Sequence, residues 1–389
     1  MKPRPLVLYA ALLGLLAKLY CAATTIGTND TETFYNFGRF IHEHGLLAQY
    51  RATPAFNHTP LVGWFCAGIY ALGQGAFFGL LLRLPGILAD LVSVWVLLRW
   101  RSGDGPPPQW ALILFALSPV QFMVSGFHGN VDAILAALLL LAVREGVHGR
   151  AGWCGIFLGL ACQVKVIPLL LAPAFFFFWT TRGRGWPFFI AASTTILAGW
   201  SVPLMTIPEV FLRNVLGYSS NWGSWGITYL LHATGAPAFA PVGFQGLTAG
   251  ETAIMSGLKW GIVAAAGWMG WRRRRSLPHE LPTTILLVWT VFLVFAPGVG
   301  AQYLVWFTPL LLLHSPCWFV AVTTASSVFL FAFYTTICHG LPWNLGISTA
   351  ELLPQWVAWS CLPWLVLVAF LFSIFLSRDR AMVQTPEGR

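Results

Sequence analysis

The chain has 389 residues, of which 57% are hydrophobic and only 9% are charged, and its mean hydropathy is +0.71. This composition excludes a soluble globular domain and predicts an integral membrane protein, because charged side chains are costly inside a bilayer. The formal net charge of +9 does not exclude a class by itself, because it would suit a nucleic-acid-binding protein as well as a membrane protein.

The distribution of the basic residues separates these two classes. They form short clusters between apolar runs, which is the pattern that places loops on the cytoplasmic side of a membrane. A nucleic-acid-binding protein would gather them on one folded face, so we expect no nucleic-acid partner. The clusters are Lys2 and Arg4, Arg99 and Arg101, Arg182 and Arg184, Arg272 to Arg275, and Arg378 and Arg380.

The first apolar run, Leu6–Ala23, has about the length of one spanning helix. It is long for the core of a cleaved signal peptide, which is the alternative, so we interpret it as a retained first helix. Twelve further apolar segments follow, at about 60–82, 84–98, 109–125, 132–144, 152–164, 167–180, 187–206, 252–271, 281–296, 303–314, 317–337 and 352–376.

These segments predict an all-α polytopic membrane protein with roughly 11–13 transmembrane helices. We expect one transmembrane domain over residues 1–380 and a short cytoplasmic tail over 381–389. With the N-terminus inside, residues 24–59 and 207–251 form outer loops. The first of these is predicted to carry catalytic residues and the second to face the substrate.

The outer loop 24–59 is polar and acidic in a chain with only 13 acidic residues. After Asp30, apolar side chains recur at spacings of three and four, which predicts an amphipathic helix on the membrane surface. Such a helix would hold Asp30 at the mouth of a cavity, although a simple helix-capping role for Asp30 or Thr31 is an alternative. The apolar positions are Phe34, Phe37, Phe40 and Ile41.

Three apolar segments lie between Pro60 and Gly126. If all three crossed the membrane, the turn GFHGN at 126–130 would lie inside. We expect one of them not to cross, because this places the turn outside and Arg99 and Arg101 inside, as the charge rule prefers.

The turn GFHGN and the start of the next helix hold His128, Asn130 and Asp132. An ionisable residue that enters an apolar helix is a functional candidate. The alternative for Asp132 is stabilisation of a helix N-terminus through the helix dipole. The sequence fits both roles of Asp132 equally well.

Lys165 lies inside a long apolar run, three residues before Pro168. The proline predicts a break in the helix there, and a lysine at such a turn suits an anionic phosphate. The alternative is a lysine that only snorkels toward the membrane interface. Arg83 and Asp90 are seven residues apart on either side of Pro85, and this spacing favours a structural ion pair.

Other polar candidates are fewer. Gln302 and Tyr303 follow a glycine-rich turn and are expected to face the same cavity. His42 and His44 have no evident third ligand, and the seven cysteines show no metal-binding spacing. We therefore expect no metal site and no required cofactor.

The order of these features resembles the GT-C class of membrane glycosyltransferases, which use polyprenyl-phosphate-linked sugars. The resemblance covers about residues 5–310, and it departs from the class at His58 and Thr59, where relatives often have tyrosine and proline. The elements that carry it are Asn29–Asp30, GLLAQY (45–50), NHTPL (57–61), LPGILAD (84–90), Ser118–Pro119, GNVDA (129–133), GLACQVK (159–165) and QYL (302–304).

The resemblance implies an inverting hexosyltransferase, with mannose favoured, that uses a polyprenyl-phosphate sugar and a lipid-linked or envelope glycan acceptor. Asp30 would be the catalytic base, and Lys165 and Arg213 would bind the donor phosphate. We expect a multi-pass protein in contact with membrane lipid, with a bacterial inner or plasma membrane favoured. The residues that would contact the sugar or the acceptor are Asn29, His58, His128, Asn130, Asp132, Gln302 and Tyr303.

A transporter or flippase for a lipid-linked or small polar substrate is the alternative function. That class is built from internal repeats with broken helices that meet at the membrane midplane. No internal repeat stands out in this sequence, which favours the transferase.

Overall fold

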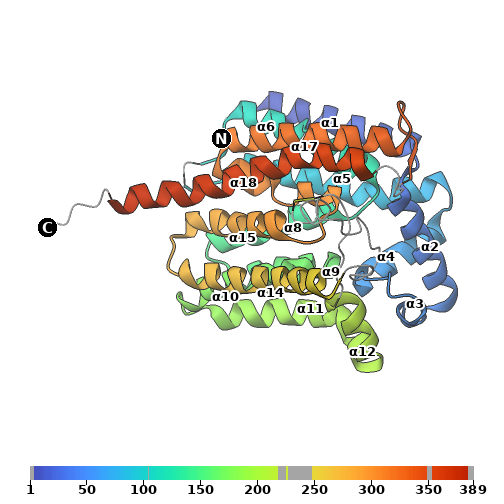
Figure 1. Ribbon diagram of the computed structural model, residues 1–389, viewed down its shortest axis with the longest axis horizontal. Helices are drawn as coiled ribbons and strands as arrows, with labels where there is room; N and C mark the ends of the chain where they lie inside the picture. Colours follow the sequence, from blue (N-terminus) through green and yellow to red (C-terminus); the bar gives the residue numbers. More distant parts are fainter. Residues whose placement is uncertain (1–3, 104, 218–224, 227–247, 348–352, 384–389) are drawn as a thin grey trace.

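The computed structural model describes residues 4–103, 105–217, 225–226, 248–347 and 353–383. The described chain is an all-α bundle, as the sequence predicts. In Figure 1 most helices run side by side along the long axis, and α2, α3 and α12 lie together at one end. The two strands of the described residues, β1 (Gly27–Thr28) and β2 (Leu345–Gly346), pair in parallel beside the start of α2.

The first half of the bundle runs from the N-terminal helix to the helix that ends at Val164. Its helices are α1 (Pro5–Thr24), α2 (Asn29–His44), α3 (Leu46–Ala52), α4 (Pro60–Leu72), α5 (Ala76–Leu98), α6 (Gln109–Ala116), α7 (Pro119–Gln121), the π-helix η1 (Phe122–His128), α8 (Asp132–Val147) and α9 (Ala151–Val164).

The second half completes the bundle. Its helices are η2 (Ile167–Leu171), α10 (Ala172–Thr180), α11 (Gly185–Thr206), α12 (Pro208–Phe211), η3 (Leu212–Leu216), α14 (Ala249–Arg272), η4 (Pro278–Glu280), α15 (Leu281–Phe295), η5 (Ala301–Val305), α16 (Thr308–His314), α17 (Pro316–Ile337) and α18 (Leu353–Val383).

Among the described residues, six helical stretches are long and apolar enough to cross a membrane, and four shorter apolar helices accompany them. The lengths of the six long stretches, 18 to 22 residues, match the roughly 20 residues that a hydrocarbon core requires. The long stretches are 5–24, 77–98, 109–128, 185–206, 278–295 and 316–337. Together they confirm a multi-pass integral membrane protein.

The loops that carry the basic clusters contact one another. Arg4 donates to the carbonyl of Pro107 at 2.9 Å, Arg184 to that of Gly149 at 2.6 Å, and Arg182 to that of Ser276 at 2.5 Å. These contacts gather the basic loops at the end of the bundle where α1 begins (Figure 1). The helix α2 lies at the opposite end.

Helix α4 is the segment between Pro60 and Gly126 that does not cross the bundle. It packs along α2, and the next helix α5 starts at the same end of the bundle, where Arg83 contacts the end of α1. The chain then crosses along α5 and returns along α6 to η1. The turn 126–130 therefore lies on the same side as Asp30, as expected.

The break within this region differs from the prediction. The predicted apolar segments 60–82 and 84–98 divide at residue 83, but α5 continues through residue 83 and Pro85, and the break lies at Gly73–Gly75. Gly75 has a φ of +63°, a conformation that glycine adopts without steric cost. Proline is tolerated inside a membrane helix because neighbouring groups satisfy the backbone.

The predicted Arg83–Asp90 ion pair is wrong. Asp90 instead binds Lys18 of α1, with 2.5 Å between Nζ and Oδ2, and the same oxygen accepts a hydrogen bond from Ser125. Arg83 is fully buried and donates to carbonyls at the end of α1 and in η1, including those of Ala22 and Gly126. One buried guanidinium can satisfy several carbonyls at once, so it ties α1 to the π-helix.

The amphipathic helix after Asp30 is present as α2, but its apolar face packs on protein. Phe34, Phe37 and Ile41 are buried, and Gly38 lies directly against the backbone of Cys66 in α4. A side chain at Gly38 would collide with that backbone, so the glycine permits the close approach. The α2–α4 contact thus fixes the position of Asp30 relative to the bundle.

Candidate active site

A cavity of about 680 Å³ lies between the start of α2, the turn before α8, the break after α9, and helices α14 and α15. Its walls differ in character from one part to another. The polar wall comes from Asn29, Asp30, Asn57, His58, His128 and Asn130, and the apolar wall from Ile167, Leu169, Leu170, Pro173, Ile262, Val263 and Phe292. Two lysines, Lys165 and Lys259, also line it.

Asp30 sits in the first turn of α2, where Thr28 is the N-cap. The Thr28 hydroxyl accepts a hydrogen bond from the Asp30 backbone N–H and donates to the carbonyl of His128 at 2.7 Å. Because Thr28 performs the capping, the Asp30 carboxylate does not. The alternative that Asp30 serves as a helix cap is therefore wrong.

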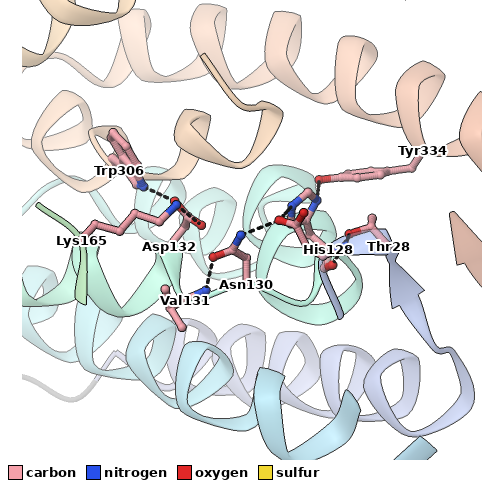
Figure 2. A network of polar contacts seen from close by, with 9 residues as sticks. Thr28, His128, Asn130, Val131, Asp132, Lys165, Trp306 and Tyr334 are labelled. Carbon is pink, nitrogen blue, oxygen red and sulfur yellow. Dashed lines mark hydrogen bonds and ion pairs between the residues drawn. The ribbon is translucent and has the colours of Figure 1, made fainter. Parts of the chain in front are cut away.

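The Asp30 carboxylate is held by the GFHGN turn. Its Oδ2 lies 3.0 Å from His128 Nε2 and 2.6 Å from Asn130 Nδ2. The Asn130 amide is itself oriented, since its Oδ1 accepts the backbone N–H of Val131 at 2.7 Å. Figure 2 shows Asn130 between the His128 and Asp132 parts of this network. Gly129, in the left-handed region with φ of +83°, makes the turn possible.

The second oxygen of Asp30 is available to a ligand. Oδ1 has no hydrogen-bond partner among the described residues, and the side chain is 31% exposed at the cavity wall. Burial raises the pKa of Asp30, but the hydrogen bond from His128 and the charge that His128 carries when protonated, with Asn130 and Lys165, lower it to about 2. Asp30 is therefore a carboxylate at neutral pH.

Lys165 occupies the predicted turn, with an extended backbone between α9 and η2. Its ammonium lies 2.9 and 3.1 Å from the two carboxylate oxygens of Asp132, which is fully buried. Trp306 Nε1 also donates to Asp132 Oδ1 at 2.6 Å, and the stacked rings of Tyr303 and Trp306 lie beside the ammonium. Figure 2 shows Lys165, Asp132 and Trp306 as one cluster.

Some of the residues predicted to contact substrate line the cavity, and others do not. Asn29, His58, His128, Asn130, Gln302 and Tyr303 all line the cavity. Asp132 does not line it and instead holds Lys165, so the structure places it behind the cavity wall. Arg213 also lies outside the cavity lining, where its Nε contacts the Asn214 side chain at 3.3 Å. Most of the predicted substrate-facing loop, 218–224 and 227–247, lies outside the described residues.

Two residues at the site are absent from the sequence-based predictions. Lys259 lines the cavity from α14 in place of Arg213. An isolated lysine in an apolar segment could have pointed to it. Tyr334 of α17 lies fully buried behind His128, with its hydroxyl 2.8 Å from Nδ1 (Figure 2). A tyrosine within an apolar helix gives no comparable signal.

His58 packs against Phe34, with 4.8 Å between ring centroids. Burial, together with the nearby charge of Lys165, lowers the pKa of His58 to about 3, against the opposing effect of Asp30. The folded state thus keeps this imidazole neutral.

Because the pKa of His58 is low in the folded state, we expect the folding stability to depend on pH. Below its unfolded pKa of 6.5 the unfolded chain binds a proton that the folded chain excludes, so stability is lost as pH falls from 6.5. The loss reaches roughly 2 kcal/mol by pH 5, from 1.36 kcal/mol per pH unit. Thermal unfolding in detergent at pH 7.5 and 5.0 measures it.

The variant His58→Gln should reduce this pH dependence, whereas His44→Gln, at an exposed position, should leave it unchanged. An equal pH dependence in the wild type and in His58→Gln would show that His58 does not cause it.

Comparison with known proteins decides the class of this site. Residues 56–297, more than half of the chain, match the profile of glycosyltransferase family 87. The chain belongs to glycosyltransferase family 87. It is therefore a membrane glycosyltransferase of the GT-C type, as its sequence elements suggest, and family membership favours the transferase over the transporter alternative. The matched residues include His128, Lys165 and Lys259, while Asp30 and Tyr334 lie outside them.

Two curated fungal proteins are similar to this family 87 chain. GPI mannosyltransferase 1 of Kluyveromyces lactis is 21% identical over 318 residues, which cover 76% of this chain and 71% of the relative. GPI mannosyltransferase 1 of Aspergillus fumigatus is 25% identical over 135 residues, covering 32% and 29%. Because both relatives are fungal, they give no support to a bacterial membrane.

Proposed function

We propose that this family 87 protein transfers a hexose, with mannose favoured, from a polyprenyl-phosphate carrier to a lipid-linked or other glycan acceptor, with inversion at the anomeric carbon. The observation that carries the proposal is the composition of the cavity. One wall presents the Asp30 carboxylate, two lysines project from other walls, and the remaining lining is apolar. These surfaces match the sugar, the phosphate and the prenyl chain of one donor molecule.

Asp30 acts as the base in this proposal. The acceptor hydroxyl gives its proton to the carboxylate while its oxygen attacks the anomeric carbon on the face opposite the phosphate. A carboxylate whose pKa lies below its usual value is a weak base toward a resting alcohol. However, the hydroxyl becomes acidic as its oxygen bonds to an oxocarbenium-like carbon, so proton transfer late in the step suffices.

The leaving group is the carrier phosphate, which takes the electron pair of the broken C–O bond and gains one negative charge. Lys165 and Lys259 supply positive charge at the cavity wall. Asp132 occupies two of the three ammonium donors of Lys165, and the third remains for a phosphate oxygen. Preorganised charge of this kind stabilises the developing anion, and the proposal needs no metal ion.

The apolar wall gives the carrier chain a route to the lipid. Residues Ile262 and Val263 of α14 line the cavity, and the same helix exposes Ile254, Trp260 and Val263 on the surface of the bundle. An exposed apolar helix face in a membrane protein contacts acyl chains. A prenyl chain can therefore leave the cavity beside α14 while its phosphate stays at the lysines.

Different observations support the identity of the sugar and the side of the membrane on which the cavity opens. The names of the two fungal relatives favour mannose. The gathering of the basic loops at the end opposite α2 favours a cavity that opens on the outer face, because positively charged loops stay in the cytoplasm.

Purified protein in lipid nanodiscs tests the donor class. With a glycan acceptor mixture, radiolabelled polyprenyl-phosphate mannose should be consumed and free polyprenyl phosphate released, and EDTA should not stop the reaction. Labelled GDP-mannose, offered as the only donor with the same acceptor mixture, should give no transfer, because it has no prenyl chain to bind the apolar wall of the cavity. Transfer from GDP-mannose, with none from the lipid-linked donor, would contradict the proposal.

A further inference from the structure

His128 contacts two groups through its two ring nitrogens, and the second of these is Tyr334. On one side Nε2 lies 3.0 Å from Asp30 Oδ2, and on the other Nδ1 lies 2.8 Å from the Tyr334 hydroxyl. Figure 2 shows the Tyr334 hydroxyl directed at the imidazole from α17. Since a carboxylate only accepts hydrogen bonds, Nε2 carries a proton. The open question is whether Nδ1 carries one as well.

The burial of Tyr334 answers this question. The side chain is fully buried, and among the described residues the one hydrogen-bond partner of its hydroxyl is His128 Nδ1. If Nδ1 carried a proton, the hydroxyl oxygen would accept it, and the hydroxyl proton would then have no acceptor. A buried donor without a partner is destabilising. The satisfied arrangement has the hydroxyl donating to an unprotonated Nδ1.

We infer that Tyr334 is a positioning residue that keeps His128 as the neutral Nε2–H tautomer, so that Asp30 is a hydrogen-bonded rather than an ion-paired base. This inference rests on the proposed role of Asp30 as the base. It adds that Tyr334, through His128, sets how strong a base Asp30 is. An imidazolium beside Asp30 would stabilise the carboxylate and make it a weaker base. The neutral imidazole orients the same oxygen without that penalty.

The surroundings of Tyr334 hold it for this task. Its ring packs edge-on against Phe127 and Trp343, with centroid distances of 5.3 and 5.5 Å. The other titratable groups near its hydroxyl are Asp30 itself, Asp132 and Cys338. Because the ring contacts do not involve the hydroxyl, the variant Tyr334→Phe removes the donor and retains the packing.

The test is nitrogen NMR of protein with ¹⁵N-labelled histidine in nanodiscs at pH 7.5, with the His128 signals assigned by comparison with His128→Gln. The wild type should show one protonated and one unprotonated ring nitrogen, with Nε2 protonated. In Tyr334→Phe, the fraction of His128 with both nitrogens protonated should rise. The variant Tyr50→Phe, which loses a buried hydroxyl bound to the His58 carbonyl, should leave the His128 signals unchanged.

Kinetics give the second readout. In Tyr334→Phe, kcat should fall by roughly 10- to 100-fold, which is part of the 10²–10⁴ that a base contributes, with the donor KM unchanged. An imidazolium or an Nδ1–H tautomer in the wild type would overturn the inference, and so would unchanged His128 signals in Tyr334→Phe. These outcomes are separate from failure of the proposed function, which would appear as full activity of Asp30→Asn whatever the state of His128.

Discussion

The variant Asp30→Asn is expected to fold normally. Its transfer activity should fall by about 10²- to 10⁴-fold, which is the usual contribution of a general base. An amide oxygen can still accept the hydrogen bonds of His128 and Asn130 that Oδ2 now receives, so the cavity wall should persist. What disappears is the oxygen that takes the acceptor proton. Product formation from polyprenyl-phosphate mannose in nanodiscs measures the loss.

Glu32 provides the matched control. It lies in the same first turn of α2 but is exposed and does not line the cavity. Glu32→Gln removes the same charge at the same membrane depth, and should keep full activity. Comparable losses in both variants would mean that negative charge near α2, rather than the Asp30 oxygen, matters.

Replacing Lys165 is expected to have two separable effects. The first is on stability, because Lys165→Met leaves Asp132 as a fully buried charge without its cation, and breaking such a pair costs about 3–5 kcal/mol. The second is on rate, because the carrier phosphate loses a charged donor, which costs about 10²- to 10³-fold in kcat in comparable oxyanion sites. Thermal unfolding and transfer kinetics measure the two.

A double variant distinguishes these effects. Lys165→Met with Asp132→Asn removes both charges, and the new amide oxygen can still accept from Trp306 Nε1. Its stability should recover toward the wild-type value while kcat stays low. If activity returned together with stability, Lys165 would be a structural residue and not a phosphate contact.

The fold could be predicted from the sequence because lipid imposes a simple rule on helix length and polarity. Most apolar segments appear as helices close to their predicted bounds, and the break at Lys165 occurs where Pro168 indicates it. The break near Gly75 and the continuity through Pro85 could not be predicted. They depend on which neighbouring groups satisfy the backbone.

The site was predictable only in part, because pairing inside the bundle depends on tertiary contacts. Asp30, His128 and Asn130 do meet at one cavity. The choice of partners was not visible, since Asp90 pairs with Lys18, 72 residues away, rather than with nearby Arg83. Tyr334 likewise reaches His128 across 206 residues of chain, from an apolar segment that shows no local sign of it.

If one cavity holds the entire donor, a structure of Asp30→Asn bound to polyprenyl-phosphate mannose will show it most directly. We predict density for the sugar beside residue 30, for the phosphate between Lys165 and Lys259, and for the chain along the apolar wall of α14. Density for the donor elsewhere on the protein, with this cavity empty, would contradict the claim.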